Sequence, residues 1–511
     1  LASGTPTKVE LGIDTAAFGG RVILDDDGDT YIEAPTDDTI DIYVAGAKDF
    51  VITANDFTAE SGSVISTDTI NETTSTSGVT IDGLLIKDSA VGATGTATSV
   101  AGIPFFQGDT GSIYTHDVSG TDSTAQYNTA YGLTALDAVT TADFVTAIGY
   151  DAGGAVTSGG YNTLLGHQAG HAITSGNTNT AVGHHSLGTN TVGDRNTAVG
   201  SGALQIFNPA SNTDDNNTAV GYGALNALTT GVHNIAIGGT ALGGDPGPTT
   251  ENHNLAMGVN SMGGNIAGGE FNVAVGNYTL DALTSGDNNV AVGYEAGTAI
   301  TTGANNTAVG ERALTATTTA SDNTALGREA SKDNITGSSN IAIGKAANNA
   351  ADTESNNLAI GVNALGGAVA GGEYNVAIGN YTLDAVTSGD NNVAVGYGAG
   401  GNITDGNDNI AIGKQTLDGT VTGDRNIAIG SLAGTDVTSA ENSVFVGNEA
   451  GANITTGVNN IAIGHQSITQ PDTEGNNLAV GTGALGGAVN GGEYNVAIGN
   501  FTLDALTSGD F

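Results

Sequence analysis

The stretch Asn289-Val290-Ala291-Val292-Gly293 decides the fold, because the same five-residue unit recurs through most of the chain. With its glycine as the marker, 22 copies lie between Gly132 and Gly499, and 16 of the 21 intervals are 17 residues long. The first position is Asn in 20 copies, the third is Ala in 20, and the fourth is apolar in every copy. A fixed period of this kind is the signature of a repeat architecture. The exceptions at the first and third positions are Val145, Ser443, Leu164 and Phe445.

Each repeat is predicted to be one coil of a parallel β-solenoid. Within the unit, Val290 and Val292 share one face and Ala291 takes the other, as in a strand, and β-branched residues favour this extended state. Recurrent glycine and turn clusters leave no uninterrupted helical stretch. The marker glycine allows a bend that a Cβ would resist. A following pair such as Ala313-Leu314 predicts a second short strand or a corner. We expect an all-β solenoid of about 22 coils, on the order of 100 Å long at the usual strand spacing.

The two most regular positions have physical explanations. A stacked Asn in each coil can bond its amide to the next coil and form a ladder along the solenoid. The small Ala indicates that something packs too close for a larger side chain. That neighbour is either the opposite wall of a narrow coil or another chain near a symmetry axis, and the pattern allows both. Insertions concentrate at Phe207–Asp215 and Gly244–Glu251, where we expect loops that leave the stack intact.

The chain before the repeats is organised differently. Residues 1–89 are predicted to be a β-rich adaptor with strands at Val22–Leu24 and Ile40–Val44, the second followed by a turn at Ala45–Lys48. Residues 90–127 are predicted to be a linker and solenoid cap, in which the aromatic cluster Ile103–Phe106 covers the first coil. Residues 128–511 are predicted to form the solenoid itself. Block duplication is also visible, since Asn357–Tyr397 closely matches Asn254–Tyr294.

Composition excludes several classes of protein. The 511 residues include 81 Gly and no Cys, and 11 Lys+Arg against 53 Asp+Glu give a formal charge of −42. A nucleic-acid binder needs a basic face, yet no Lys or Arg lies between Arg195 and Arg312 or beyond Arg425. Disulfides are impossible, and no apolar run approaches the ~18–20 residues of a membrane span. We therefore expect neither nucleic-acid partners nor membrane insertion.

The unit Asn-[Thr/Ile/Val]-Ala-[Val/Ile]-Gly-x-x-Ala-Leu resembles the head repeats of trimeric autotransporter adhesins, and its 17-residue form is similar to repeats of bacteriophage and marine-bacterial fibre proteins. The resemblance covers roughly residues 128–511, and it implies a left-handed β-roll that associates as a homotrimer. The segment Asp27–Glu33 with Asp37–Ile42 is similar to a short motif in phage tail-fibre shafts. The adhesin unit is shorter, and the membrane-anchor barrel and coiled-coil stalk of that family are missing from this sequence. We expect a virion fibre whose ends extend beyond the sequence given.

Two clusters of side chains are candidates for metal binding. Asp25, Asp27 and Asp29 place carboxylates at alternate positions, as a Ca²⁺ loop would, although the spacing is not that of an EF-hand. A solvated Asp-Gly turn is the alternative. His167 and His184 occupy the same position in successive coils, with His185 beside them. Neighbouring ladder positions rarely give tetrahedral geometry, so we interpret these as surface side chains rather than metal ligands.

The residue after each marker glycine varies widely, which predicts an exposed face. Tyr222, Tyr294 and Tyr397 lie on it and are candidates for contact with a glycan or receptor. No pattern of catalytic residues is present, so we expect no enzyme activity and no cofactor other than a possible Ca²⁺. A catalytic groove requires irregular coils, which makes a polysaccharide depolymerase the least favoured alternative.

The sequence thus leads us to expect an extracellular structural protein, the shaft of a phage tail fibre. Its expected partners are further copies of the same chain, a host glycan or receptor, and a virion tail or baseplate protein. A bacterial surface adhesin or filament with the same repeats is the first alternative. The second is a monomeric solenoid that binds glycan or ice, which turns such as Thr301-Thr302 mildly favour.

Overall fold

The computed structural model describes residues 21–24, 26–36, 39–53, 57–59, 98–100, 103–107, 112–115, 124–211, 215–244, 252–264, 266–350, 352–367, 371–469, 473–487 and 492–506. The chain divides into two compact units, Leu1–Ala90 and Val91–Phe511, which are described separately. The described residues form strands, turns and loops but no helix. None of them therefore belongs to a helix with the length and apolar character that a membrane crossing requires.

The first unit contains a five-stranded antiparallel sheet in the order β1-β2-β3-β4-β5. Its strands are β1 (Arg21–Ile23), β2 (Tyr31–Thr36), β3 (Thr39–Val44), β4 (Ala47–Thr53) and β5 (Phe57–Ala59). The predicted strands near residues 22 and 40 are confirmed. The turn after β3 is shorter than predicted, because Ala45 (φ 48°) and Gly46 (φ 77°) alone close the hairpin, as in a type I′ turn.

Three short strands lead into the solenoid of the second unit: β6 (Thr98–Val100), β7 (Ile103–Gln107) and β8 (Ile113–Tyr114). β7 pairs antiparallel with β6 and β8, and β8 pairs parallel with the first repeat strand. The aromatic cluster at 103–106 therefore lies on the strand that precedes the ladder, although its side chains lie outside the described part. β6 lies within residues 90–127, the segment predicted to be a linker and solenoid cap.

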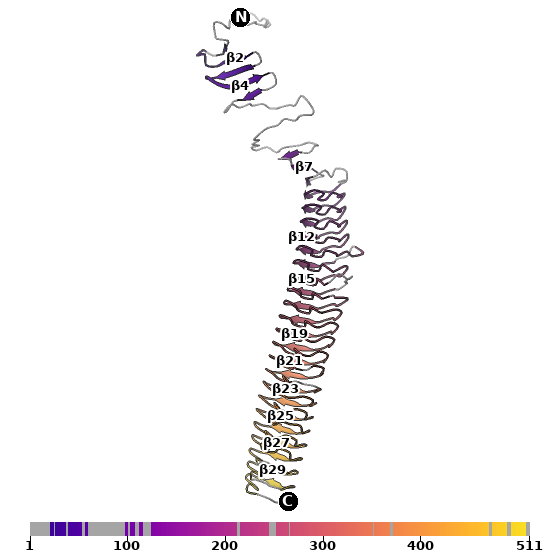
Figure 1. Cartoon of the computed structure of the whole chain (residues 1–511), viewed down its shortest axis with the longest axis vertical. Helices are drawn as coiled ribbons and strands as arrows, with labels where there is room; N and C mark the ends of the chain where they lie inside the picture. The colour runs from indigo at the N-terminus through magenta and orange to yellow at the C-terminus, as the bar shows by residue number, and fades with distance from the viewer. Residues whose placement is uncertain are drawn as a thin grey trace. The chain divides into compact units, whose positions relative to one another are not determined.

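The solenoid consists of one three-residue strand per repeat, each ending at the residue before a marker glycine (Figure 1). Each strand pairs parallel and in register with the strands of the preceding and following coils, and the pairing continues across both insertions. Residues 245–251 of the second insertion are outside the described residues. The strands are β9 (Thr129–Tyr131), β10 (Thr146–Ile148), β11 (Thr163–Leu165), β12 (Thr180–Val182), β13 (Thr197–Val199), β14 (Thr218–Val220), β15 (Ile235–Ile237), β16 (Leu255–Met257), β17 (Val273–Val275), β18 (Val290–Val292), β19 (Thr307–Val309), β20 (Thr324–Leu326), β21 (Ile341–Ile343), β22 (Leu358–Ile360), β23 (Val376–Ile378), β24 (Val393–Val395), β25 (Ile410–Ile412), β26 (Ile427–Ile429), β27 (Val444–Val446), β28 (Ile461–Ile463), β29 (Leu478–Val480) and β30 (Val496–Ile498).

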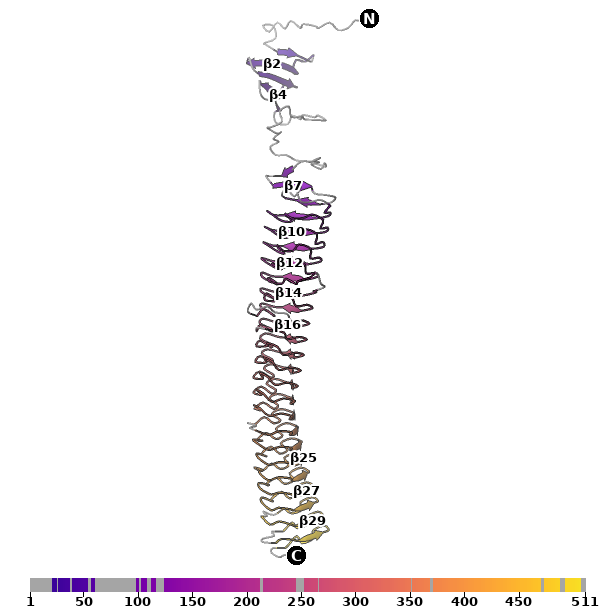
Figure 2. The same ribbon diagram turned by 90° about the vertical axis from the view of Figure 1, so that its right-hand side faces the viewer.

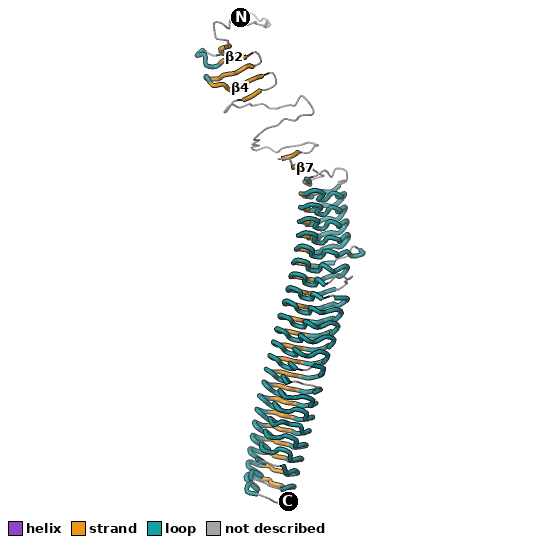
Figure 3. The backbone as a smooth tube through the Cα atoms, in the orientation of Figure 1, coloured by secondary structure: helices purple, strands orange, loops and turns teal. Residues whose placement is uncertain are grey.

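The predicted all-β solenoid is confirmed, and each coil is mostly turn. Figure 2 shows the coils stacked along the second unit, and Figure 3 shows that strand occupies only a short segment of each coil. The pair Ala313-Leu314 was predicted to be either a second short strand or a corner. It lies in a turn, so the corner is confirmed. Leu314 has φ 50° there and points into the core, where it is fully buried.

The central Ala of each strand lies inside its own coil. Its side chain is at most 1% exposed in all 20 copies, and it belongs to one continuous apolar core with the corner residues. Of the two explanations left open for the small residue, the opposite wall of a narrow coil is correct. The explanation by a neighbouring chain is wrong at this position, because no accessible side-chain surface remains for such a contact.

The marker glycines are required by the stacking distance as well as by conformation. Gly293 has φ +136°, and a Cβ there would lie 2.6 Å from the carbonyl oxygen of Gly310 in the next coil. A side chain would therefore separate the two coils.

The predicted Asn ladder is confirmed, and most of its bonds join side chain to main chain. Asn289 Oδ1 accepts the main-chain N–H of Asn306 at 3.0 Å, and Asn289 Nδ2 donates to the Gly303 carbonyl at 2.9 Å. The buried side chain of Asn289, the N–H of Asn306 and the carbonyl of Gly303 thereby all have hydrogen-bond partners. Where Ser443 replaces Asn, its Oγ accepts the N–H of Asn460 at 3.2 Å, so the exception keeps the acceptor.

Candidate functional site

A histidine cluster lies on the coils that contain Gly166 and Gly183. His167 and His184 directly follow these two glycines, and their rings stack at 5.1 Å. His185 meets His184 edge to face at 4.2 Å and His167 at 5.7 Å. One ring nitrogen from each of the three lies within 4.8 Å of the others. The structure thus brings together the three imidazoles that the sequence placed beside one another and that we interpreted as surface side chains.

A fourth imidazole, that of His171, joins this cluster and was missed from the sequence. Its ring packs edge-on against His185 with centroids 6.0 Å apart. Its Nδ1 is buried and has no hydrogen-bond partner among the described residues. Burial, and then the neighbouring His184, His171 and His167, lower the pKa of His185. A lowered pKa favours the neutral ring at neutral pH.

The proposed calcium loop is only partly described. Asp25 lies outside the described residues. Asp27 is exposed, and Asp29 is half-buried in the connection between β1 and β2, where its carbonyl accepts the N–H of Gly46 at 2.8 Å. The Ca²⁺ site at Asp25, Asp27 and Asp29 stays a prediction.

The three tyrosines proposed for glycan contact are exposed. Tyr222 is 72% exposed, Tyr294 49% and Tyr397 54%. Tyr294 meets Tyr278 edge to face at 6.1 Å, and Tyr397 has the same relation to Tyr381 at 5.8 Å. The expected exposure of this face is confirmed at these positions, while contact with a glycan or receptor stays a prediction.

Two columns of stacked rings on another part of the coil were not predicted. Tyr127, Phe144 and Tyr161 stack with centroids 5.0 Å apart, and a second column contains His233, His253 and Phe271 at 4.9 and 4.8 Å. All six residues directly precede the ladder position, where φ is near 60° in every coil. Most other coils have Asn, Asp or Ser at this position. Asn and Asp adopt the left-handed conformation more readily than other non-glycine residues do. The sequence did contain a signal for these columns: an aromatic residue or histidine directly before the ladder position, where Asn is the most frequent residue.

The outer face of the strand ladder is uncharged and mostly apolar, with threonine at the first position of β9 to β14, β19 and β20. It comprises the first and third residue of each strand from β9 to β30, and all of these residues are uncharged. Ile237, Ile412 and Ile463 are 37–39% exposed, and most other residues of this face are half-buried. In a chain of charge −42, one uncharged column of side chains therefore runs the length of the ladder. We call this surface the strand face.

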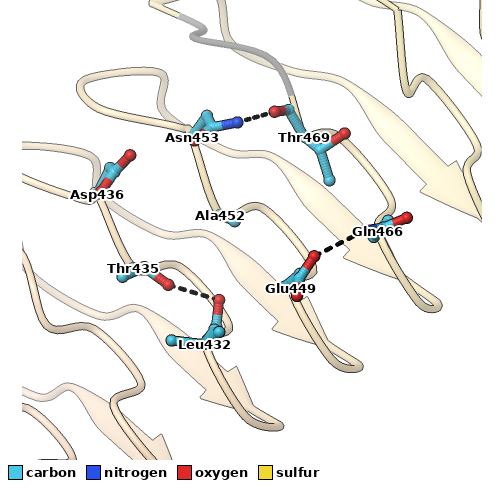
Figure 4. A pocket seen from close by; sticks show the side chains of 8 residues that line it. All are labelled: Leu432, Thr435, Asp436, Glu449, Ala452, Asn453, Gln466 and Thr469. Carbon is cyan, nitrogen blue, oxygen red and sulfur yellow. Dashed lines mark hydrogen bonds between the residues drawn. The ribbon is translucent and has the colours of Figure 1, made fainter.

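A shallow groove crosses the corners of three successive coils near β26 to β28 (Figure 4). Gln466 Nε2 donates to Glu449 Oε2 at 2.7 Å, and Asn453 Nδ2 donates to the carbonyl of Thr469. These bonds run from one coil to the next, so the polar lining ties coils together. The groove is lined by Leu432, Thr435, Asp436, Glu449, Ala452, Asn453, Gln466 and Thr469.

Comparison of the chain with models of protein families, with curated proteins and with solved structures found no match.

Proposed function

We propose that the chain is a structural subunit of an extracellular fibre, in which copies of the solenoid pack against one another through the strand face. The observation that carries this proposal is the uncharged, mostly apolar face of β9 to β30. Contiguous exposed apolar surface of this extent marks an interaction site.

Sheet physics supports a covered strand face. Purely parallel sheets occur almost only where both faces are buried, and their strands are apolar on both sides. Here Ala291 fills the inner face of β18, while Val290 and Val292 remain partly exposed on the outer face. Because the column repeats once per coil, a partner must present the same axial spacing to match it along its length. A second copy of this chain has that spacing.

The remaining surface supports a fibre that stays apart from its neighbours. None of the strand-face residues is acidic. The acidic side chains of the described coils therefore lie elsewhere on the shaft, where like-charge repulsion opposes lateral aggregation of assembled shafts. Meanwhile every coil is bonded to the next through the strand and, in most coils, the Asn ladder. The role proposed for the shaft is mechanical: it carries a receptor-contacting end, or the virion end, across a distance.

The copy number three and the virion setting rest on the resemblance of the repeats to trimeric adhesin heads and phage fibres. A tail or baseplate protein would hold one end, and a host glycan or receptor would meet the other. A bacterial surface filament built from the same repeats is the alternative setting, and the same packing of strand faces applies to it.

The test is the mass of the chain in solution by light scattering, with negative-stain images of the same sample. A thin rod with the mass of three chains is expected. The double variant Val292→Glu with Val309→Glu places charges on the strand face and should give lighter particles. Thr302→Glu, in an exposed turn between them, is the matched control and should leave the mass unchanged. A wild-type monomer would contradict the proposal.

The aromatic columns support a glycan contact as a second role of the shaft. Sugar rings stack on aromatic faces, and Tyr127, Phe144 and Tyr161 hold three rings in one column despite a left-handed backbone. Binding to a glycan array should fall for Phe144→Ala and for Tyr222→Ala if both surfaces contribute. Loss only for Tyr222→Ala would assign the contact to the face predicted from sequence.

The threonine turns that mildly favoured the ice-binding alternative would have to present free hydroxyl groups. Thr301 Oγ1 instead donates to the Thr318 carbonyl at 3.1 Å, and Thr284 Oγ1 donates to the Thr301 carbonyl at 3.0 Å. These hydroxyl groups bond the next coil, which favours a structural role for the threonine turns.

A further inference from the structure

Histidines are concentrated at one place in this chain. Of the 8 in the sequence, His167, His171, His184 and His185 fall within two successive coils. The repeat explains why His167 and His184 stack, since both follow a marker glycine. It does not explain His171 and His185, which occupy two other positions of the coil.

We propose that His167, His184 and His185 bind one divalent transition-metal ion of the zinc class, with His171 as a positioning residue. Imidazole nitrogen is a preferred ligand of Zn²⁺, Co²⁺, Ni²⁺ and Cu²⁺. Three protein nitrogens and a water complete the four positions of a tetrahedral site.

The observed spacing is close to what such a site needs. At Zn–N distances of about 2.0–2.1 Å, ligand nitrogens lie about 3.3–3.4 Å apart in a tetrahedron. The three nitrogens are now within 4.8 Å of one another. His167 and His184 are exposed, so rotation of their side chains can close the remaining distance. The backbones are already fixed, because His185 N donates to the carbonyl of His167 at 3.0 Å.

His171 supplies the second observation. Its buried Nδ1 lacks a hydrogen-bond partner in the described part of the chain, and an unmet buried acceptor or donor is costly. Its ring lies edge-on to His185, the least exposed of the three proposed ligands. His171 is thereby assigned to hold His185 in place rather than to bind the metal.

The proposed ion would clamp two coils near the beginning of the ladder. His167 from the coil of Gly166, and His184 and His185 from the coil of Gly183, would be joined through metal–nitrogen bonds. These bonds are stronger than the ring stacking that now links the two coils. The clamp does not depend on the fibre proposal, since all its ligands come from one chain.

The test is titration of the metal-stripped full chain with Co²⁺, followed by visible absorption, and with Zn²⁺, followed by calorimetry. One equivalent per chain is expected, with the intense visible bands of tetrahedral Co²⁺ and their loss when Zn²⁺ is added. His184→Ala and His185→Ala should each abolish this binding. His171→Ala should keep the one-to-one stoichiometry but bind about tenfold more weakly, and His171→Gln should recover part of the loss.

The matched control is His233→Ala, which removes one ring from a column containing only two histidines, His233 and His253, stacked at 4.9 Å. Its Co²⁺ spectrum should equal that of the wild type. Circular dichroism and thermal unfolding without metal establish that each variant is folded. No saturable binding, or binding that survives the double variant His184→Ala/His185→Ala, would overturn the proposal. Binding lost in His233→Ala would assign the metal to the other column and would overturn it as well.

Discussion

Phe445 fills the space that Gly451 leaves open. Phe445 takes the third position of its unit, where 20 of 22 copies have Ala, and it is fully buried. A Cβ on Gly451 would overlap the ring at Cδ1, and one on Gly434 would lie 2.9 Å from Cδ2. The large side chain is therefore accommodated by glycines at one corner of its own coil and of the preceding coil.

The other exception at the Ala position has the same arrangement. Leu164 is fully buried, and a Cβ on Gly170 or Gly153 would lie 2.7 or 2.6 Å from its methyl groups. These glycines again belong to the corners of its own coil and of the preceding one. Volume is thus conserved within the interior, as close packing requires.

The first prediction is a coupling between residues 445 and 451. Gly451→Ala should destabilise the wild type strongly, since the new methyl group meets the ring of Phe445. In the Phe445→Ala background the same change should cost about 1–3 kcal/mol less. The left-handed φ of residue 451 is common to both backgrounds and cancels. A double-mutant cycle from thermal or denaturant unfolding measures the coupling, and additive effects would contradict the packing argument.

The second prediction concerns the Asn ladder. Asn289→Ala leaves the N–H of Asn306 and the carbonyl of Gly303 buried without their partner, and each such loss costs about 1–3 kcal/mol. Asn289→Ser should cost less, because Ser443 shows that a hydroxyl oxygen can accept the N–H of the next coil. Hydrogen exchange of peptides around residue 306 should be fastest in the Ala variant and intermediate in the Ser variant. Equal protection in all three proteins would argue against the ladder.

The third prediction concerns the marker glycines. Gly293→Ala adds a methyl group 2.6 Å from the Gly310 carbonyl oxygen at a φ of +136°, so it should cost about 3 kcal/mol or more. Gly239→Ala is the control, because a Cβ there meets nothing within 4 Å. Limited proteolysis should cut the Gly293→Ala chain near that coil and leave the control intact. Comparable resistance of the two variants would mean that coil spacing does not require glycine.

The fourth prediction is a pair of opposite pH effects. Burial raises the pKa of Asp384, so its folded state binds a proton more tightly than the unfolded state does. The stability that this group contributes is complete below its unfolded pKa of about 3.9 and is lost as pH rises through the raised folded pKa. Asp384→Asn should therefore raise the unfolding temperature at neutral pH, and the gain should vanish in acid.

Asp405 supplies the opposite sign. Its carboxylate accepts hydrogen bonds from Thr387 Oγ1 at 2.6 Å and Ser388 Oγ at 2.8 Å, and these bonds lower its pKa. The stability that Asp405 contributes to the folded state is present above its unfolded pKa and is lost as pH falls through its lowered folded pKa. Asp405→Asn should lower the unfolding temperature at neutral pH, by a modest amount because the group is exposed. Unfolding curves from roughly pH 3 to pH 7 separate the two variants; shifts of the same sign would contradict the assignment.

Much of the fold was predictable because its determinants are local and repeated. The 17-residue period, the alternation around Ala291 and the glycine that ends each unit together predict a strand, a bend and a stack. The Asn ladder followed for the same reason, since a residue in register repeats its partner in every coil. Each determinant lies within one unit, so the one-dimensional pattern contains it.

The candidate site depended on geometry that the period does not contain. The meeting of His171 with His185 joins different positions of neighbouring coils, and that contact depends on how each corner turns. The left-handed residue before each ladder Asn, which carries the Phe144 column, likewise became visible only with its backbone angles.

The sequence by itself determined that the chain forms stacked β-coils with an alternating strand, because residue spacing sets which side chains share a face. Only the tertiary structure decided what each face meets. It placed the small Ala against the opposite wall of its own coil and left Val290 and Val292 outside. The physical reason is that alternation separates two faces without telling which of them the chain folds around, and closure of the coil makes that choice.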